Sequence, residues 1–303
     1  MAVPLVECVP NFSEGRDGEI VAAILDAVRG VPGARLLDSS SDPDHNRTVV
    51  TLAGPPEAAG QAAFAAVACA AARIDLRTHR GEHPRIGAAD VVPFIPLRGM
   101  SMADCAELAR MVGRRIGEEL DLPVYLYGEA ALRSDGKKLS DIRKGGFEGL
   151  AAAIGVDPAR APDFGPARIG PAGATAVGAR GPLIAFNVYL ASADLSAARS
   201  IAARIRASSG GFPALQALGM MAGGRAQVSM NLTDYTRTSL PQAYRAVRAE
   251  ADLLGVRIER SELIGLIPRA AAAGWDAEEV RLEKFSPERI LEHRLREAGL
   301  LKD

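Results

Sequence analysis

Residues 79–96 hold the densest group of side chains suited to chemistry in this chain of 303 residues. They include two of the four histidines, His79 and His83, on a stretch that ends in an apolar, strand-like run. Gly81 and Pro84 break any regular helix there. Because histidine titrates near neutral pH, His83 is the first candidate for a general acid or base. The alternative is a loop histidine that only hydrogen-bonds to backbone atoms.

His79 and His83 are four residues apart, as two metal ligands on a helix would be. The glycine and proline between and beside them argue against that helix, and no third ligand is evident. We therefore expect no metal. His79 either orients His83 or is solvated, and the sequence does not separate these alternatives.

Three other stretches carry polar or unusual patterns. An acidic loop leads into a strand, and it is either part of a site or a solvated hairpin; it contains Asp38, Asp42, Asp44, His45, Asn46 and Arg47. A basic run is typical of a solvated surface, with contact to an anionic tail as the alternative; it contains Lys137, Lys138, Arg143 and Lys144. Residues 163–181 are rich in glycine but lack a phosphate-loop ending, so the glycines allow close approach of a flat ligand or simply form turns.

Alternating strands and helices must position these residues. The expected strands are 5–9, 47–53, 91–95, 123–127, 182–190, 212–218, 226–232 and 263–267. The expected helices are 17–29, 56–73 with proline near its start, 102–120 capped by Ser101, 194–207, 240–254 and 287–297. Residues 38–44 are expected to be a loop, and residues 163–181 an extended connection between two halves.

Both halves follow the order β-α-β-β-α-β. This order predicts an α/β (α+β) protein of two ferredoxin-like subdomains related by duplication, residues 1–181 and 182–303. Each would carry helices on one face of its sheet, and a cleft between two such subdomains is a common place for a small-molecule site.

Composition narrows the class of protein. Hydrophobic residues make up 48% of the chain, enough for a substantial core. The net charge of −1 gives no basic excess that would indicate nucleic acid, and no long apolar span or basic-then-apolar leader indicates a membrane or secretion. The three cysteines are odd in number and widely spaced, so we expect no disulfide framework and a cytoplasmic location.

Several long, compositionally unusual segments carry a family resemblance. They are residues 6–15, 46–48, 81–96, 124–131, 163–166, 173–175 and 178–180. On these segments the chain resembles the glutamate formimidoyltransferase (formiminotransferase) family over essentially all 303 residues.

The resemblance implies transfer of a formimidoyl group between 5-formimidoyltetrahydrofolate and L-glutamate in histidine degradation, with tetrahydrofolate as co-substrate and no metal. It implies that the two subdomains enclose a folate groove and that His83 is the catalytic acid/base. It also implies a folate-binding segment comprising Gly165, Pro166, Ala167, Arg168, Ile169, Gly170, Pro171, Ala172 and Gly173. From residue type and position, the candidates for binding substrate are Asn11, Asp38, Arg47 and Arg85.

Two departures from the family pattern bear on substrate choice. Where the family often has a second acid two residues after Asp38, this chain has Ser40, and the segment before Gly173 is one residue shorter than the animal form. A related transferase that uses another amine, such as glycine, and a folate carrier therefore remain alternatives. Animal relatives are fused to a cyclodeaminase; here we expect any cyclodeaminase to be a separate protein. A homodimer is the default expectation for assembly.

Overall fold

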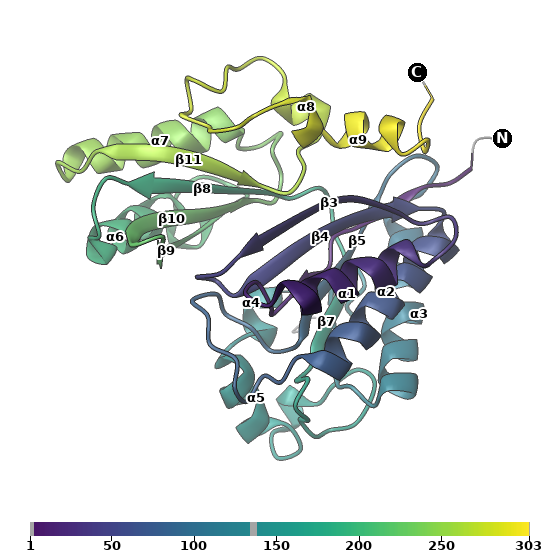
Figure 1. Ribbon diagram of the computed structural model, residues 1–303. Helices are drawn as coiled ribbons and strands as arrows, with labels where there is room; N and C mark the ends of the chain where they lie inside the picture. The colour runs from purple at the N-terminus through teal and green to yellow at the C-terminus, as the bar shows by residue number, and fades with distance from the viewer. Residues whose placement is uncertain (1–2, 134–137, 303) are drawn as a thin grey trace. The chain divides into compact units, whose positions relative to one another are not determined.

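A computed structural model describes residues 3–133 and 138–302 (Figure 1). The chain divides into two compact units, Met1–Arg180 and Gly181–Asp303. Each unit has its own sheet and its own hydrophobic core. We refer to them as the first and second units.

Within the described residues, the sheet of the first unit has seven strands. They are β1 (Val6–Cys8), β2 (Asn11–Phe12), β3 (Arg35–Asp42), β4 (Arg47–Gly54), β5 (Ala89–Pro96), β6 (Val124–Gly128) and β7 (Thr175–Ala179). The short strands β1 and β2 both lie between β4 and β5, and β3 forms one edge against β4. Strands β1 to β5 pair antiparallel, whereas β7 runs parallel to both β5 and β6.

Three helices cover one face of this sheet: α1 (Gly18–Arg29), α2 (Pro56–Arg73) and α3 (Met102–Leu120) (Figure 1). Interactions between neighbouring residues determine where each of these helices begins. The Asp17 side chain accepts two backbone N–H groups of α1, and Pro56 occupies the first position of α2, where no N–H is needed. Ser101 and Asp104 form a reciprocal capping box at α3. The predicted 17–29, 56–73 and 102–120 helices are confirmed.

The opposite face of the sheet is covered in part. Helices α4 (Leu139–Ile142) and α5 (Gly146–Ala153) contribute apolar side chains that pack on Tyr125 and Tyr127. Near the β3 edge the same face carries polar residues instead. Cross-strand partners point to one face, and the register pairs Asp42 with Arg47 and Asp38 with Thr51.

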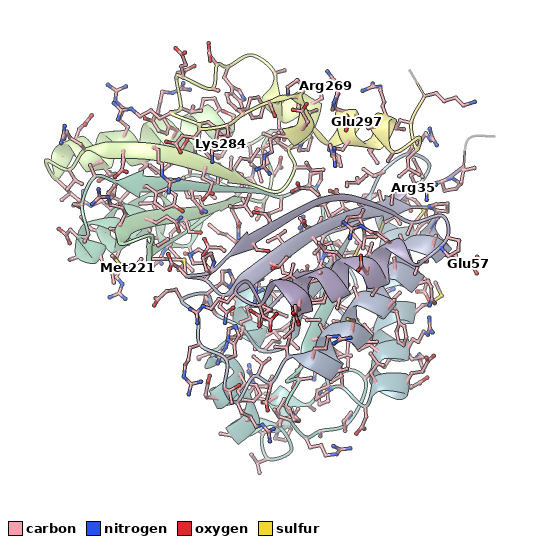
Figure 2. All side chains as sticks on the ribbon, viewed as in Figure 1. Arg35, Glu57, Met221, Arg269, Lys284 and Glu297 are labelled. Atoms are coloured by element: carbon pink, nitrogen blue, oxygen red, sulfur yellow. The ribbon has the colours of Figure 1, made fainter. Side chains whose placement is uncertain are left out.

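Two sequence predictions about this unit are wrong. Residues 38–42 form the second half of β3 and not a loop, because hydrogen bonding to the buried strand β4 outweighs the low strand propensity of serine and aspartate. Figure 2 labels Arg35 at the opposite end of β3 from Asp42. Residues 163–181 are also more than a connection, because they contain β7, a buried strand between β5 and β6.

The second unit has the element order β-α-β-β-α-β. It comprises β8 (Ile184–Leu190), α6 (Leu195–Ile205), β9 (Leu215–Ala222), β10 (Arg225–Leu232), α7 (Leu240–Leu253) and β11 (Ile258–Ile264), followed by α8 (Arg269–Ala272) and α9 (Leu291–Glu297). The strand order is β11-β8-β10-β9, all antiparallel, and α6 and α7 share one core with the sheet. The predicted strand at 263–267 is displaced, since β11 begins at Ile258. The predicted helix at 287–297 is a 3-10 turn, Pro287–Arg289, followed by α9.

In the described part of the chain, no helix combines the length and apolar character needed to cross a membrane. Cys8, Cys69 and Cys105 are all free thiols.

Candidate active site

The irregular segment between α2 and β5 carries His83, and the turn between β3 and β4 holds this segment in place. Asn46 accepts a hydrogen bond from the Gly15 N–H at 2.9 Å and donates one to the Arg80 carbonyl at 3.0 Å. The Glu82 N–H donates to the Asp44 carbonyl at 3.2 Å. A Cβ atom at Gly81 would lie 2.3 Å from the His45 carbonyl oxygen, so only glycine allows this approach.

The other end of the segment is anchored by the glycine-rich stretch before β7. Gly87 and Gly173 form a backbone bridge, and the Ala174 N–H donates to the Ile86 carbonyl at 2.9 Å. A Cβ atom at Gly87 would lie 1.8 Å from the Ala174 carbonyl oxygen. The Ser13 hydroxyl also donates to the Gly87 carbonyl at 2.7 Å. These contacts explain why glycines flank the histidine segment.

His83 is half-buried, and its protonation pattern follows from its contacts. Nδ1 lies 2.8 Å from the Pro84 carbonyl oxygen. A carbonyl oxygen can only accept, so Nδ1 of the neutral ring carries the hydrogen and Nε2 presents a lone pair. Burial, together with the positive charges of Arg47 and Arg143, lowers the pKa of His83 well below its usual value, and Asp90 opposes this effect only in part. His83 is therefore neutral at pH 7.

Asp90 is a buried carboxylate that pairs with two arginines, and the charges of all three act on His83. Asp90 is fully buried, and its Oδ2 accepts from Arg47 Nη1 at 2.8 Å and from Arg143 Nη2. Its Oδ1 accepts the Ile86 N–H at 2.9 Å. Burial raises the pKa of Asp90, but Arg143 and Arg47 outweigh burial and hold that pKa far below its usual value. Burial lowers the pKa of Arg47 to about 10, which leaves it charged at neutral pH.

Arg143 corrects the sequence interpretation of the basic run as a solvated surface. It follows α4, its side chain is only 17% exposed, and it forms an ion pair with Asp90. Its Nε is buried and has no hydrogen-bond partner among residues 3–133 and 138–302. The two arginines and Asp90 together carry one net positive charge. Lys137, from the same run, lies outside the described residues.

Two of the predicted substrate residues meet at this cluster. The side-chain Oδ1 of Asn11 accepts from Arg47 Nε at 3.1 Å, and its Nδ2 donates to the Val9 carbonyl at 2.8 Å. The structure thus brings Asn11 and Arg47 together from β2 and β4, which are paired strands.

Arg85, a third predicted substrate residue, belongs to a separate cluster. Its guanidinium donates to both carboxylate oxygens of Glu148, at 2.9 and 3.1 Å, and its Nε donates to His79 Nδ1 at 3.0 Å. His79 Nε2 lies 3.0 Å from the Asn46 carbonyl oxygen and therefore carries the hydrogen. His79 is buried with both nitrogens engaged, so it is not a solvated histidine.

Asp38 lies on β3, four residues from Asp42, on the same face of the sheet as Arg47. At about 3.3 Å per residue, that spacing places it roughly 13 Å along the strand from Asp42. Ser40 lies between them on this face, opposite Val49. Asp38 and Asp42 therefore lie at separate points along this face of the sheet.

The predicted folate segment is partly exposed over residues 165–170. Gly165 adopts a φ of +78°, and a Cβ atom there would lie 2.0 Å from the Leu122 carbonyl oxygen. Arg168 is exposed and pairs with Asp121. The Pro171 and Ala172 carbonyls accept the N–H groups of Leu76 and Ala88, each at 2.8 Å, so the end of the segment is tied to the histidine segment.

Sequence reasoning assigned no individual role to three residues that the structure brings to His83: Asp90, Arg143 and His45. His45 and Arg143 belong to polar stretches for which it had left a site role open. The His45 ring centroid lies 6.1 Å from that of His83. No local pattern marks these residues as a group, because they come from β5, the end of α4 and the β3–β4 turn. The described residues contain no group of three or more His, Cys, Asp or Glu side chains arranged to hold a metal ion.

Comparison with known proteins adds an independent finding. Residues 5–180 match the model of the formiminotransferase domain, N-terminal subdomain, and residues 185–295 match that of the formiminotransferase domain. The chain is 45% identical to the glutamate formimidoyltransferase of Thermoplasma acidophilum, covering 97% of this chain and 98% of that protein, and 41% identical to that of Streptococcus pyogenes serotype M1, covering 96% and 98%. It is 44% identical to the formimidoyltransferase-cyclodeaminase of Rattus norvegicus over 88% of this chain but 51% of that protein. The chain belongs to the formiminotransferase family.

Proposed function

We propose that this protein is a glutamate formimidoyltransferase, which transfers the formimidoyl group between 5-formimidoyltetrahydrofolate and L-glutamate. The observation that carries the proposal is the state of His83. Its Nδ1 hydrogen is held by the Pro84 carbonyl, and burial together with the positive charges of Arg47 and Arg143 lowers its pKa and keeps the ring neutral. That is the state a general base needs at neutral pH.

The proposed reaction begins when the α-amine of glutamate attacks the formimidoyl carbon. His83 Nε2 takes a proton from the attacking nitrogen as the new C–N bond forms. The tetrahedral intermediate then breaks its bond to N5 of tetrahydrofolate, and N5 must gain a proton to leave. Proton transfer by a positioned side chain of this kind contributes about 10²–10⁴-fold to the rate.

We propose that Arg47 and Arg143 bind a carboxylate of glutamate. They carry one more positive charge than Asp90 neutralises, and the Arg143 Nε is buried without a partner among the described residues. Guanidinium groups bind carboxylates through charge-assisted hydrogen bonds. Arg85 stays a second candidate, with its guanidinium shared with Glu148. Asn11 orients Arg47 through the hydrogen bond to Nε.

We propose that the folate lies against Gly165, Pro166, Ala167, Arg168, Ile169, Gly170, Pro171, Ala172 and Gly173. Partial exposure of this segment and its backbone ties to the histidine segment support the assignment. Asp38, on the same face as Arg47, stays a candidate for binding a cationic part of the substrate, since a carboxylate stabilises a neighbouring positive charge.

We also propose that both units derive from a ferredoxin-like arrangement. The second unit has the order β11-β8-β10-β9 with two helices on one face. With β1 and β2 counted as one interrupted strand, since both lie between β4 and β5, the first unit follows the same β-α-β-β-α-β order through β5. It then adds α3, β6, α4, α5 and β7.

The deciding experiment supplies purified protein with 5-formimidoyltetrahydrofolate and L-glutamate, with glycine and no-amine controls. Release of tetrahydrofolate that depends on glutamate supports the proposal. Transfer to glycine but not glutamate would replace it with the alternative acceptor, for which Ser40 on the face of Asp38 and Asp42 is the motivating observation. Folate binding without transfer to any amine would favour a carrier.

A further inference from the structure

His45 is a buried histidine that the proposed reaction has not used. It lies in the turn between β3 and β4 and is 8% exposed. Its Nε2 is buried and has no hydrogen-bond partner in the part of the chain that the structure describes. An unpartnered buried nitrogen destabilises a fold, so its presence calls for an explanation. A bound substrate that supplies the missing partner is such an explanation.

The turn fixes the direction of this ring. Asp42 Oδ1 accepts the N–H groups of both Asp44 and His45 at 2.8 Å. Asn46 adopts a left-handed conformation with φ of +46°, and Gly81 packs against the His45 carbonyl. The ring Nδ1 lies 3.9 Å from Asp42 Oδ2, so Nδ1 faces a carboxylate and Nε2 lies on the other side of the ring.

The two imidazoles can contact one small group. Their ring centroids are 6.1 Å apart and the rings are tilted by 54°. A hydrogen bond of about 2.9 Å from a ring nitrogen places its partner about 4 Å from the ring centroid. One atom at that distance from both centroids satisfies a separation of 6.1 Å. The separation therefore permits one atom to lie within hydrogen-bond reach of both rings.

We propose that His45 is a second catalytic histidine, whose Nε2 gives a proton to the leaving N5 of tetrahydrofolate while His83 takes one from the attacking amine. This inference rests on the proposed function. As the new C–N bond forms, His83 gains the proton lost by the glutamate nitrogen. As the C–N5 bond breaks, its electron pair goes to N5, which takes the proton from His45. The two rings then exchange protons with water or product to restore their starting states.

The charges around the two rings are compatible with His45 acting as the acid and His83 as the base. The carboxylate of Asp42 lies 3.9 Å from His45 Nδ1, the ring nitrogen opposite the unpartnered one. Burial and the charges of Arg47 and Arg143 act on His83, where they favour the neutral ring. A carboxylate thus faces His45, whereas two guanidinium groups act on His83.

The test uses the full chain with His45→Gln and His45→Ala, measured for kcat, KM of both substrates and folate binding. We expect kcat to fall about 100-fold in each variant, at the lower end of the usual acid–base contribution, with folate binding retained. Added imidazole should restore turnover of His45→Ala in a dose-dependent way, because it replaces the proton donor. A purely structural histidine would not respond in this manner.

The remaining histidines provide matched controls. His293→Ala, in α9 beside Glu297, should leave kcat unchanged. His79→Gln removes a buried histidine whose nitrogens are both engaged, and any activity that it loses should be accompanied by a lower melting temperature. A kcat of His45→Gln within twofold of wild type, or no imidazole rescue of His45→Ala, would overturn the inference while leaving the transferase intact. Absence of glutamate-dependent transfer by the wild type would instead remove the proposed function, and the inference with it.

Discussion

Two arginine clusters of the first unit differ in how completely their charges are matched. In one, Arg47 and Arg143 share the single carboxylate of Asp90. In the other, Arg85 has Glu148 as a two-point partner and His79 as an acceptor. Asp90 is fully buried, whereas the Glu148 side chain is 64% exposed. The first cluster thus has a buried carboxylate and a net positive charge, and the second is balanced and has a carboxylate open to water.

Under the proposed function, we expect the charge of the first cluster to serve chemistry and that of the second to hold a loop. An unmatched buried charge is unfavourable for folding unless a ligand or reaction uses it. Burial and the two arginines of the first cluster lower the pKa of His83, while burial and, to a smaller extent, Arg85 lower the pKa of His79. We therefore expect substitutions in the first cluster to alter catalysis and stability strongly, and those in the second to act weakly.

The largest effect is expected for His83→Ala. Removing the proposed base should reduce kcat by about 10²–10⁴-fold, while folate binding persists because the folate segment is untouched. Stopped assays of glutamate-dependent tetrahydrofolate release, with folate binding measured by fluorescence, provide the test. Near-normal turnover in a correctly folded variant would end the general-base proposal.

Asp90→Asn should strongly destabilise the protein. It leaves Arg47 and Arg143 buried without a counter-charge, and breaking a buried pair costs about 3–5 kcal/mol. Glu148→Gln is the matched control, because an exposed pair contributes about 0–1 kcal/mol. Urea unfolding of both variants measures the contrast. Equal losses of unfolding free energy would mean that burial does not distinguish the two clusters.

Substitution of the arginines should separate their roles in substrate binding. Arg47→Ala should raise KM for glutamate by roughly 10–100-fold, as expected for loss of a charged hydrogen bond of about 1.5–3 kcal/mol. Arg85→Ala should raise it less, since Glu148 already occupies its guanidinium. Initial rates at saturating folate measure both values. An unchanged KM would remove that residue from the account of glutamate binding.

The smallest expected effect is on the pH dependence of the rate. A base acts in its neutral form, and the pKa of His83 is lowered, so the acidic limb of kcat, measured with both substrates saturating, should lie below pH 6.5. Arg143→Gln removes a positive charge, which should raise the pKa of His83 and shift the acidic limb to higher pH. Arg85→Gln is the control and should leave the limb in place. A limb that does not move in Arg143→Gln would exclude electrostatic control of His83 by this arginine.

Local signals in the sequence were sufficient for much of the scaffold. The helix at Pro56–Arg73 has a proline at its first position and a run of alanines, and Ser101 with Asp104 forms a complete cap within four residues. These are interactions between near neighbours, so they can be read without knowing the fold. By contrast, β3 is rich in serine and aspartate and β7 in small residues, and both are strands because neighbouring strands pair with them.

The sequence by itself determined that an ionisable segment around His83 lies between an alanine-rich helix and an apolar strand, and that the chain resembles formiminotransferases. Only the tertiary structure brought Arg47, Asp90 and Arg143 into one buried cluster and set His45 beside His83. These residues are separated by tens of positions and meet through strand pairing and the packing of the segment after α4. Electrostatic effects depend on distance and burial, so no local pattern could reveal which charges control the histidine.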